Sequence, residues 1–167
     1  MTSLEKIQQA LRQWAVPPKI KWDISATWHV PNAMREKYGG WDDRWHECEM
    51  RKYLNAVDRR IYKAAHKNRG MRVYRWMAME RAGGVGWHSH GLLQTPAHMS
   101  HQAFIDELCG LWHRHCGLQN ALPFQSFIFE AELVKADFFN YTIKDLSNLN
   151  ENANGVLDTH NTVLPKL

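Results

Sequence analysis

Two β-rich segments joined by a glycine-rich turn constrain the fold of this chain more than any other feature. The segments are "RVYRWMAME" (72–80) and "WHSHGLLQT" (87–95), and the intervening "RAGGVG" contains three glycines. β-rich segments separated by a short glycine-rich turn are typical of a β-hairpin. The sequence therefore predicts two adjacent antiparallel strands that form a hairpin.

The pattern on either side of this hairpin predicts an α+β domain. Apolar residues at helical spacing predict helices over residues 4–15, 42–68, 101–116 and 135–146. Two further strands are predicted over 20–30 and 124–133. The order β-α-β-β-α-β-α favours a central antiparallel sheet with flanking helices. We expect a single domain over 1–167, with a core of about 20–147 and a tail over 148–167.

Local features indicate where several of these elements begin and end. Ser100 is expected to cap helix 101–116, and Gly117 is expected to terminate it. Gly70 follows the end of helix 42–68. Pro31 and the glycine pair at 39–40 indicate a loop after the first strand, and the asparagine-rich tail is also predicted to be loop.

The composition excludes several classes of protein. Hydrophobic residues make up 44% of the 167 positions and charged residues 23%, as in a globular protein. No apolar run approaches the roughly 20 residues that cross a bilayer, so no membrane partner is expected. The N-terminus lacks the apolar core of a signal peptide. Three cysteines without a C-x-x-C pair favour reduced thiols and a cytoplasmic location.

Positive charge is concentrated in the first half of the chain. Residues 1–80 contain 16 Lys and Arg against 9 Asp and Glu, whereas residues 81–167 contain 5 against 8. Such a basic region suits a phosphate backbone. The candidate DNA-binding residues are those on the second predicted helix, namely Arg59, Arg60, Lys63, Lys67 and Arg69. The alternative is a solvated helix face.

The hairpin brings together three residues that could bind a metal ion. His88 and His90 lie two residues apart on a strand, so their side chains share one face. Glu80 is expected opposite or close to His88 across the glycine turn. Two imidazoles and one carboxylate form an open site that accepts Mg²⁺ or Mn²⁺. The alternative is two surface histidines beside an ordinary strand glutamate.

Other histidines are predicted to be structural. His113 and His115 form a second H-x-H triplet, but on a helix their side chains point in different directions. His29 on the first strand could reach the metal-binding residues or DNA, and a structural role is the expectation for it.

Tyr141 and Lys144 form a second candidate catalytic group. They lie three residues apart on a predicted helix and therefore share a face. A phenol with a pKa near 10 is a poor nucleophile, and a nearby ammonium group and a metal-polarised phosphate would activate it. The alternatives are a tyrosine at the edge of the core and a solvated surface lysine.

Taken together, these motifs resemble those of the HUH endonucleases. "WHSHGLL" resembles their motif of two histidines around a hydrophobic residue, and "NYTIK" resembles their Y-x-x-K nucleophile motif. "DISATW" stands where replication initiators carry their first strand motif, and Glu80 matches their third metal ligand. The resemblance covers about residues 20–147. The layout is most similar to the single-tyrosine replication initiator (Rep) class of phages, plasmids and related mobile elements.

The resemblance implies a ferredoxin-like, RRM-like HUH nuclease fold and a DNA-nicking activity. Mg²⁺ or Mn²⁺ would be held by Glu80, His88 and His90. Tyr141 would attack single-stranded DNA at an origin or hairpin, leaving a 5′-phosphotyrosine and a 3′-OH that primes rolling-circle replication. Lys144 would neutralise charge near the nucleophile or help to position the metal. Host replication proteins or a helicase are the further partners implied. The given sequence contains no Walker A motif, so it encodes no helicase itself. The resemblance also implies that the protein is located in the host cell compartment of a mobile element.

One departure and two alternatives accompany this resemblance. The family has a bulky apolar residue between the histidines, where this chain has Ser89. Because Ser89 faces away from the metal, we expect altered packing behind the sheet rather than a lost site. The alternatives are a single-tyrosine transposase of the same superfamily and a non-catalytic DNA-binding module on the same fold.

Overall fold

The structure is a computed structural model. It describes residues 20–37, 42–82, 86–118, 129–134 and 155–165, together with Lys6, Gln9, Ala10 and Gln13. These four N-terminal residues are helical, as predicted for 4–15. The helix predicted over 135–146 lies outside the described residues. In the part of the chain that is described, no helix has the length and apolar character needed to span a bilayer.

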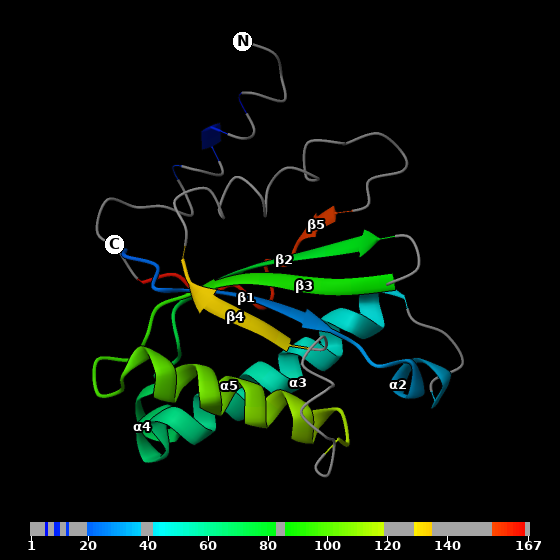
Figure 1. The fold of residues 1–167 in the computed structure, drawn as a ribbon. Helices are drawn as coiled ribbons and strands as arrows, with labels where there is room; N and C mark the ends of the chain where they lie inside the picture. The colour runs from blue at the N-terminus through cyan, green and yellow to red at the C-terminus, as the bar shows by residue number, and fades with distance from the viewer. Residues whose placement is uncertain are drawn as a thin grey trace.

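Five antiparallel strands form the sheet at the centre of the molecule (Figure 1). They are β1 (Ile24–His29), β2 (Arg75–Ala82), β3 (Gly86–Leu93), β4 (Phe129–Leu133) and β5 (Gly155–Leu157). Their spatial order is β4-β1-β3-β2-β5, so the first four strands follow the ferredoxin-like arrangement. The predicted α+β fold with a central antiparallel sheet is confirmed, and so is the β2–β3 hairpin.

The longer helices cover one face of this sheet (Figure 1). The described helices are α2 (Asn32–Lys37), α3 (Asp43–Tyr62), α4 (Ala64–Arg69) and α5 (His101–His115). α3 and α5 bury their apolar sides against alternate strand residues. The resulting core includes Ile24, Trp28, Met77, Leu93, Met50, Tyr53, Leu54, Phe104, Leu108 and Trp112.

The predicted helix boundaries are largely confirmed. The Ser100 side chain accepts a hydrogen bond from the backbone N–H of Ala103 at the start of α5. Gly117 follows α5 and Gly70 follows α4, and both adopt positive φ angles, of 73° and 64°. Glycine is favoured there because a Cβ atom would be strained in the left-handed conformation.

The prediction of one continuous helix over 42–68 is wrong. Lys63 interrupts it with a φ angle of 46°, so that α3 ends at Tyr62 and α4 begins at Ala64. No glycine or proline stands at this position to indicate the break. The loop predicted after Pro31 is also partly wrong, because α2 begins at Asn32. The Pro31 carbonyl accepts the first hydrogen bonds of this short helix.

The prediction that the tail over 148–167 is loop is wrong for the end of the chain. β5 pairs with the outer edge of β2, with Val156 opposite Met79, and Val163 forms a further bridge to Arg75. Three residues are too few to show an alternating pattern, so the sequence does not predict this strand. Residues 155–157 therefore belong to the sheet, and Val163 adds an isolated bridge to it.

The face of the sheet opposite α3 and α5 has two different ends. Trp76 and Leu92 lie at one end, where they pack with Ile20 and Trp22 in a second apolar cluster. The other end, next to the hairpin turn, carries Glu80, His88 and His90 in place of apolar residues. This polar end is the site described next.

Candidate metal centre

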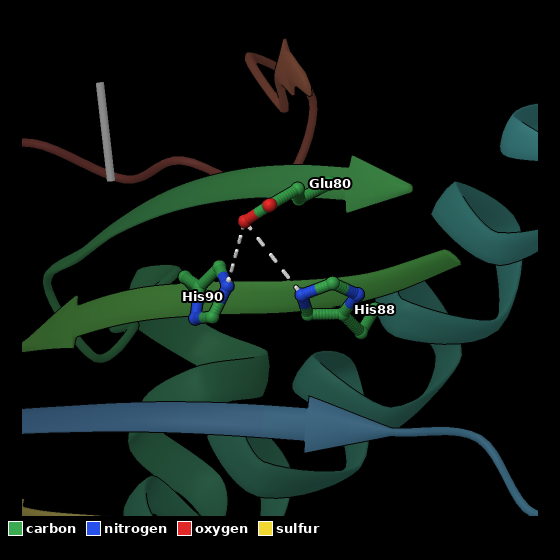
Figure 2. Close-up of side chains that lie close together, drawn as sticks. All are labelled: Glu80, His88 and His90. Atoms are coloured by element: carbon green, nitrogen blue, oxygen red, sulfur yellow. Dashed lines mark hydrogen bonds and ion pairs between the residues drawn. The ribbon is translucent and has the colours of Figure 1, made fainter. Parts of the chain in front are cut away.

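Glu80, His88 and His90 converge on one point at the polar end of the sheet (Figure 2). Glu80 on β2 pairs directly with His88 on β3, as the glycine turn predicts. The Oε2 atom of Glu80 lies 3.7 Å from Nε2 of His88 and 3.2 Å from Nε2 of His90. One oxygen and two nitrogens are thus brought together by two adjacent strands.

The other ring nitrogen of each histidine already has a partner. Nδ1 of His90 lies 2.9 Å from the Thr27 hydroxyl on β1. Nδ1 of His88 lies 3.2 Å from the carbonyl oxygen of Gly86, which can accept its proton. A partner at Nδ1 fixes the orientation of a ring and leaves Nε2 directed at a ligand. This arrangement is typical of metal-binding histidines.

Burial strengthens the case for a metal ion over a surface cluster. His88 and His90 are only 5% and 4% exposed, whereas the Glu80 side chain is 19% exposed. The alternative of two surface histidines is therefore excluded for these side chains. Two buried nitrogen donors and one accessible carboxylate match the donor set of a divalent ion with open coordination positions. The residues fit a metal ion, and water or substrate oxygens would complete its coordination.

Ser89 faces the opposite side of β3, as expected. Its side chain is fully buried, and its hydroxyl lies 2.7 Å from Nε2 of His46 on α3. Burial, together with the smaller effects of the neighbouring His88 and Arg35, lowers the pKa of His46 to about 3. His46 is therefore neutral at physiological pH. A polar pair thus fills this position behind the sheet, on the face opposite Glu80, His88 and His90.

His29 lies beside the candidate metal ligands. Its ring stacks on that of His88, with centroids 5.2 Å apart and an interplanar angle of 24°. Burial lowers the pKa of His29, and His88 and Arg35 lower it further, whereas Glu130 opposes the shift. The backbone of His29 also has a structural contact, because its carbonyl accepts a hydrogen bond from the Trp112 indole. The backbone of His29 therefore has a structural role, while its ring lies beside the candidate metal ligands.

Sequence reasoning missed Arg35, which lies on α2 at the same end of the sheet. Its Nη1 atom is 2.8 Å from the position that a Cβ atom would occupy at Gly86. Gly86, with a φ angle of 76°, is the residue whose carbonyl oxygen contacts His88. Because these residues were predicted to be loop, nothing in the sequence indicated that Arg35 lies near the histidines.

The predicted DNA-binding residues lie away from these ligands. All five belong to α3, α4 or the residue that joins them, on the side of the sheet opposite Glu80, His88 and His90 (Figure 1). Arg60 is held by Glu107 of α5, with Nη2 and Oε1 3.0 Å apart. The structure does not bring Arg59, Arg60, Lys63, Lys67 and Arg69 to the candidate metal centre.

The remaining predicted residues have separate outcomes. Tyr141 and Lys144 lie outside the described residues, so their positions stay a prediction. On α5, Nε2 of His115 lies 3.0 Å from Oε2 of Glu49, and His113 contacts the Cys109 sulfur at 3.5 Å. Both histidines are thus structural, as expected. All three cysteines are free, which agrees with the predicted reduced thiols.

A second group of potential metal ligands was not predicted. Glu47 on α3 lies near Asp158 and His160, which follow β5. Oε1 of Glu47 is 3.1 Å from Nδ1 of His160. The two carboxylate oxygens of Asp158 accept hydrogen bonds from the backbone and side-chain N–H groups of Asn161. These contacts join the end of the chain to α3.

Comparison of the chain with protein-family models, with curated proteins and with solved structures finds no match.

Proposed function

We propose that this chain is a metal-dependent endonuclease that nicks and rejoins single-stranded DNA, and that it initiates rolling-circle replication of a mobile element. The observation that carries the proposal is the convergence of two buried Nε2 atoms on one carboxylate oxygen, 3.2 and 3.7 Å away. The ferredoxin-like strand order adds support, because the three ligands lie on its two adjacent strands β2 and β3.

The proposal includes Mg²⁺ or Mn²⁺ as the metal. Imidazole nitrogens favour Mn²⁺, and the carboxylate suits either ion. A divalent ion held by Glu80, His88 and His90 would supply Lewis-acid polarisation of a phosphoryl oxygen. Thr27 and Gly86 would orient the two imidazoles, and the exposure of Glu80 would leave a side from which substrate can approach.

The proposed nucleophile is Tyr141. Its phenolic oxygen would attack the phosphorus of a DNA phosphodiester, forming the bond to a 5′-phosphotyrosine while the bond to the 3′ oxygen breaks. The phenol loses its proton to water, and the departing 3′ oxygen gains one. Lys144, one helical turn away in the predicted helix, would stabilise the phenolate. Attack by the 3′-OH on the phosphotyrosine reverses the step and rejoins the strand.

The test is the formation of a covalent protein–DNA adduct. The protein is incubated with Mn²⁺ and a labelled pool of single-stranded oligonucleotides of random sequence, which includes hairpins. The wild-type protein is expected to form an adduct that survives denaturation. Tyr141→Phe is expected to form none, and Tyr74→Phe, which changes a partly exposed tyrosine, is expected to retain it.

The outcomes separate the proposal from its alternatives. An adduct that survives Tyr141→Phe would exclude this tyrosine as nucleophile. Metal-dependent binding of the oligonucleotides without any adduct would instead favour the non-catalytic DNA-binding module. Sequencing of the captured strands would give the recognised sequence and would separate a replication origin from a transposon end.

A further inference from the structure

We propose that Arg35 binds a phosphate of the DNA strand next to the one at the metal ion. This inference rests on the proposed function, and it adds a substrate contact that neither the sequence motifs nor the metal ligands supply. It starts from the position of Arg35, whose guanidinium group lies against Gly86 at the first residue of β3.

The contact between Arg35 and Gly86 depends on the absence of a side chain at residue 86. A Cβ atom there would lie 2.8 Å from Nη1 and 3.1 Å from Cζ of Arg35, so the guanidinium group would have to shift to make room for it. The glycine thus allows the guanidinium group to lie two residues before His88. That separation is roughly 7 Å along a strand, which suits a neighbouring phosphate rather than the same one.

Among the residues that the structure describes, none provides an anionic partner for the guanidinium group of Arg35. Within the described ranges, no carboxylate forms an ion pair with Arg35, and its Nε atom is enclosed without a hydrogen-bond partner. Taking a cation partly out of water without a counter-charge is unfavourable, and such a group calls for an explanation. Because Nε is enclosed, an incoming anion would be bound by the terminal nitrogens of this partly exposed residue.

Phosphate is the ligand that suits this position. A guanidinium group binds phosphate oxygens through two parallel N–H groups. The surrounding charge also favours an anion, because the proposed metal ion is a cation and Glu80 is the one carboxylate of the candidate metal centre.

The side of the site formed by β4, away from Arg35, would repel DNA. On β4, Glu130 and Glu132 lie opposite Thr27 and Ser25 of β1, and with Ala131 these residues line a recess of about 230 Å³. Both glutamates are exposed. A phosphate backbone that leaves the metal ion would therefore pass towards α2 and Arg35 rather than towards β4.

The test measures DNA binding without metal, so that it is independent of nicking. A labelled single-stranded oligonucleotide of mixed sequence is titrated with protein in EDTA at several salt concentrations. Arg35→Gln is expected to weaken binding about tenfold and to reduce the slope of log K against log salt by about 0.7, as for one lost phosphate contact. Arg35→Lys, which keeps the charge but not the paired donors, is expected to lose about threefold.

Two controls separate phosphate binding from a structural role. Arg114→Gln removes an exposed arginine on α5 and is expected to leave the affinity and the salt slope unchanged. The affinity of Arg35→Gln for Mn²⁺ and its unfolding temperature are expected to match those of the wild type. A parallel loss of Mn²⁺ affinity and stability would show that Arg35 only supports the fold.

A measurement on the wild-type protein avoids any effect of substitution on folding. Phenylglyoxal modifies accessible arginines, and peptide mass spectrometry reports each site separately. The oligonucleotide is expected to protect Arg35 several-fold and to leave Arg114 unprotected. Equal modification of Arg35 with and without oligonucleotide, or equal affinities of wild type and Arg35→Gln, would overturn the inference. The absence of an adduct at Tyr141 would contradict only the proposed function.

Discussion

The two groups of potential metal ligands in this protein use similar side chains in different ways. Glu80, His88 and His90 lie on two strands of one hairpin, and both imidazoles are buried and held at Nδ1. In the second group, formed by Glu47, Asp158 and His160, the His160 side chain is 66% exposed. Glu47 is also engaged by Arg51, and Asp158 is occupied by Asn161.

The difference shows that proximity alone does not make a metal centre. In the first group, Thr27 and Gly86 contact the Nδ1 atoms of the two histidines. The Nε2 atoms therefore stay directed towards Glu80, where a metal ion would bind. In the second group the outer contacts are made to the carboxylate oxygens themselves. We therefore interpret the first group as a metal centre and the second as an anchor between the end of the chain and α3.

The largest expected effect is the loss of DNA cleavage when a histidine of the first group, but not of the second, is replaced. His88→Ala and His90→Ala each remove a ligand and should reduce Mn²⁺-dependent cleavage of single-stranded DNA by about a hundredfold or more. His160→Ala should change it less than about twofold. The rates are measured by gel electrophoresis of a labelled strand. Comparable losses from His90→Ala and His160→Ala would remove the distinction between the groups.

The next largest effect concerns the contact between the Thr27 hydroxyl and Nδ1 of His90 in the first group. Thr27→Val preserves the shape of the side chain but removes the hydroxyl that lies 2.9 Å from Nδ1 of His90. Loss of such a contact typically costs 10–100-fold in metal affinity, and we expect about tenfold here. Isothermal titration with Mn²⁺ measures it. Ser25→Ala on the same strand is the control, and an unchanged affinity for Thr27→Val would show that the hydroxyl does not orient His90.

The second group is expected to affect stability rather than metal binding. Asn161→Ala removes the amide that donates to Asp158 and to the Glu47 carbonyl, leaving buried acceptors unpaired. The free energy of unfolding should fall by about 1–3 kcal/mol in urea denaturation. The Mn²⁺ affinity should stay the same. A variant with normal stability and weakened Mn²⁺ binding would reverse the two assignments.

A pH dependence of stability originates behind the first group. His46 stays neutral in the folded protein down to about pH 3, whereas in the unfolded chain it gains a proton below its ordinary pKa of 6.5. Its contribution to stability is thus complete above pH 6.5 and decreases as the pH falls towards 3, by up to about 1.4 kcal/mol per pH unit.

The comparison of wild type with His46→Gln isolates this dependence from that of other titrating groups. Urea denaturation at pH 7, 6, 5 and 4 should give a steeper decrease in the free energy of unfolding for the wild type than for the variant. Parallel curves would show that His46 does not stay neutral in the folded protein.

Local features of the sequence predicted much of this fold and site. The glycine turn fixed the pairing of Glu80 with His88, because hairpin register depends on a few adjacent residues. Ser100 and Gly117 likewise predicted the ends of α5, since caps act within a single turn.

The features that the sequence did not predict depend on distant contacts. The partner of Ser89, His46, lies 43 residues away, and no local pattern links the two. β5 exists because the outer edge of β2 can pair with it. The break between α3 and α4 falls at Lys63, where no glycine indicates it. The position of Arg35 depends on α2, which is too short to show helical periodicity in the sequence.

Anomalous X-ray scattering from a crystal soaked in Mn²⁺ tests the central claim most directly. The claim is that Glu80, His88 and His90 hold a divalent ion. A manganese peak within bonding distance of Oε2 of Glu80 and both Nε2 atoms is expected, and it should disappear in His90→Ala. A peak confined to Glu47, Asp158 and His160, or none near the two buried histidines, would contradict the claim.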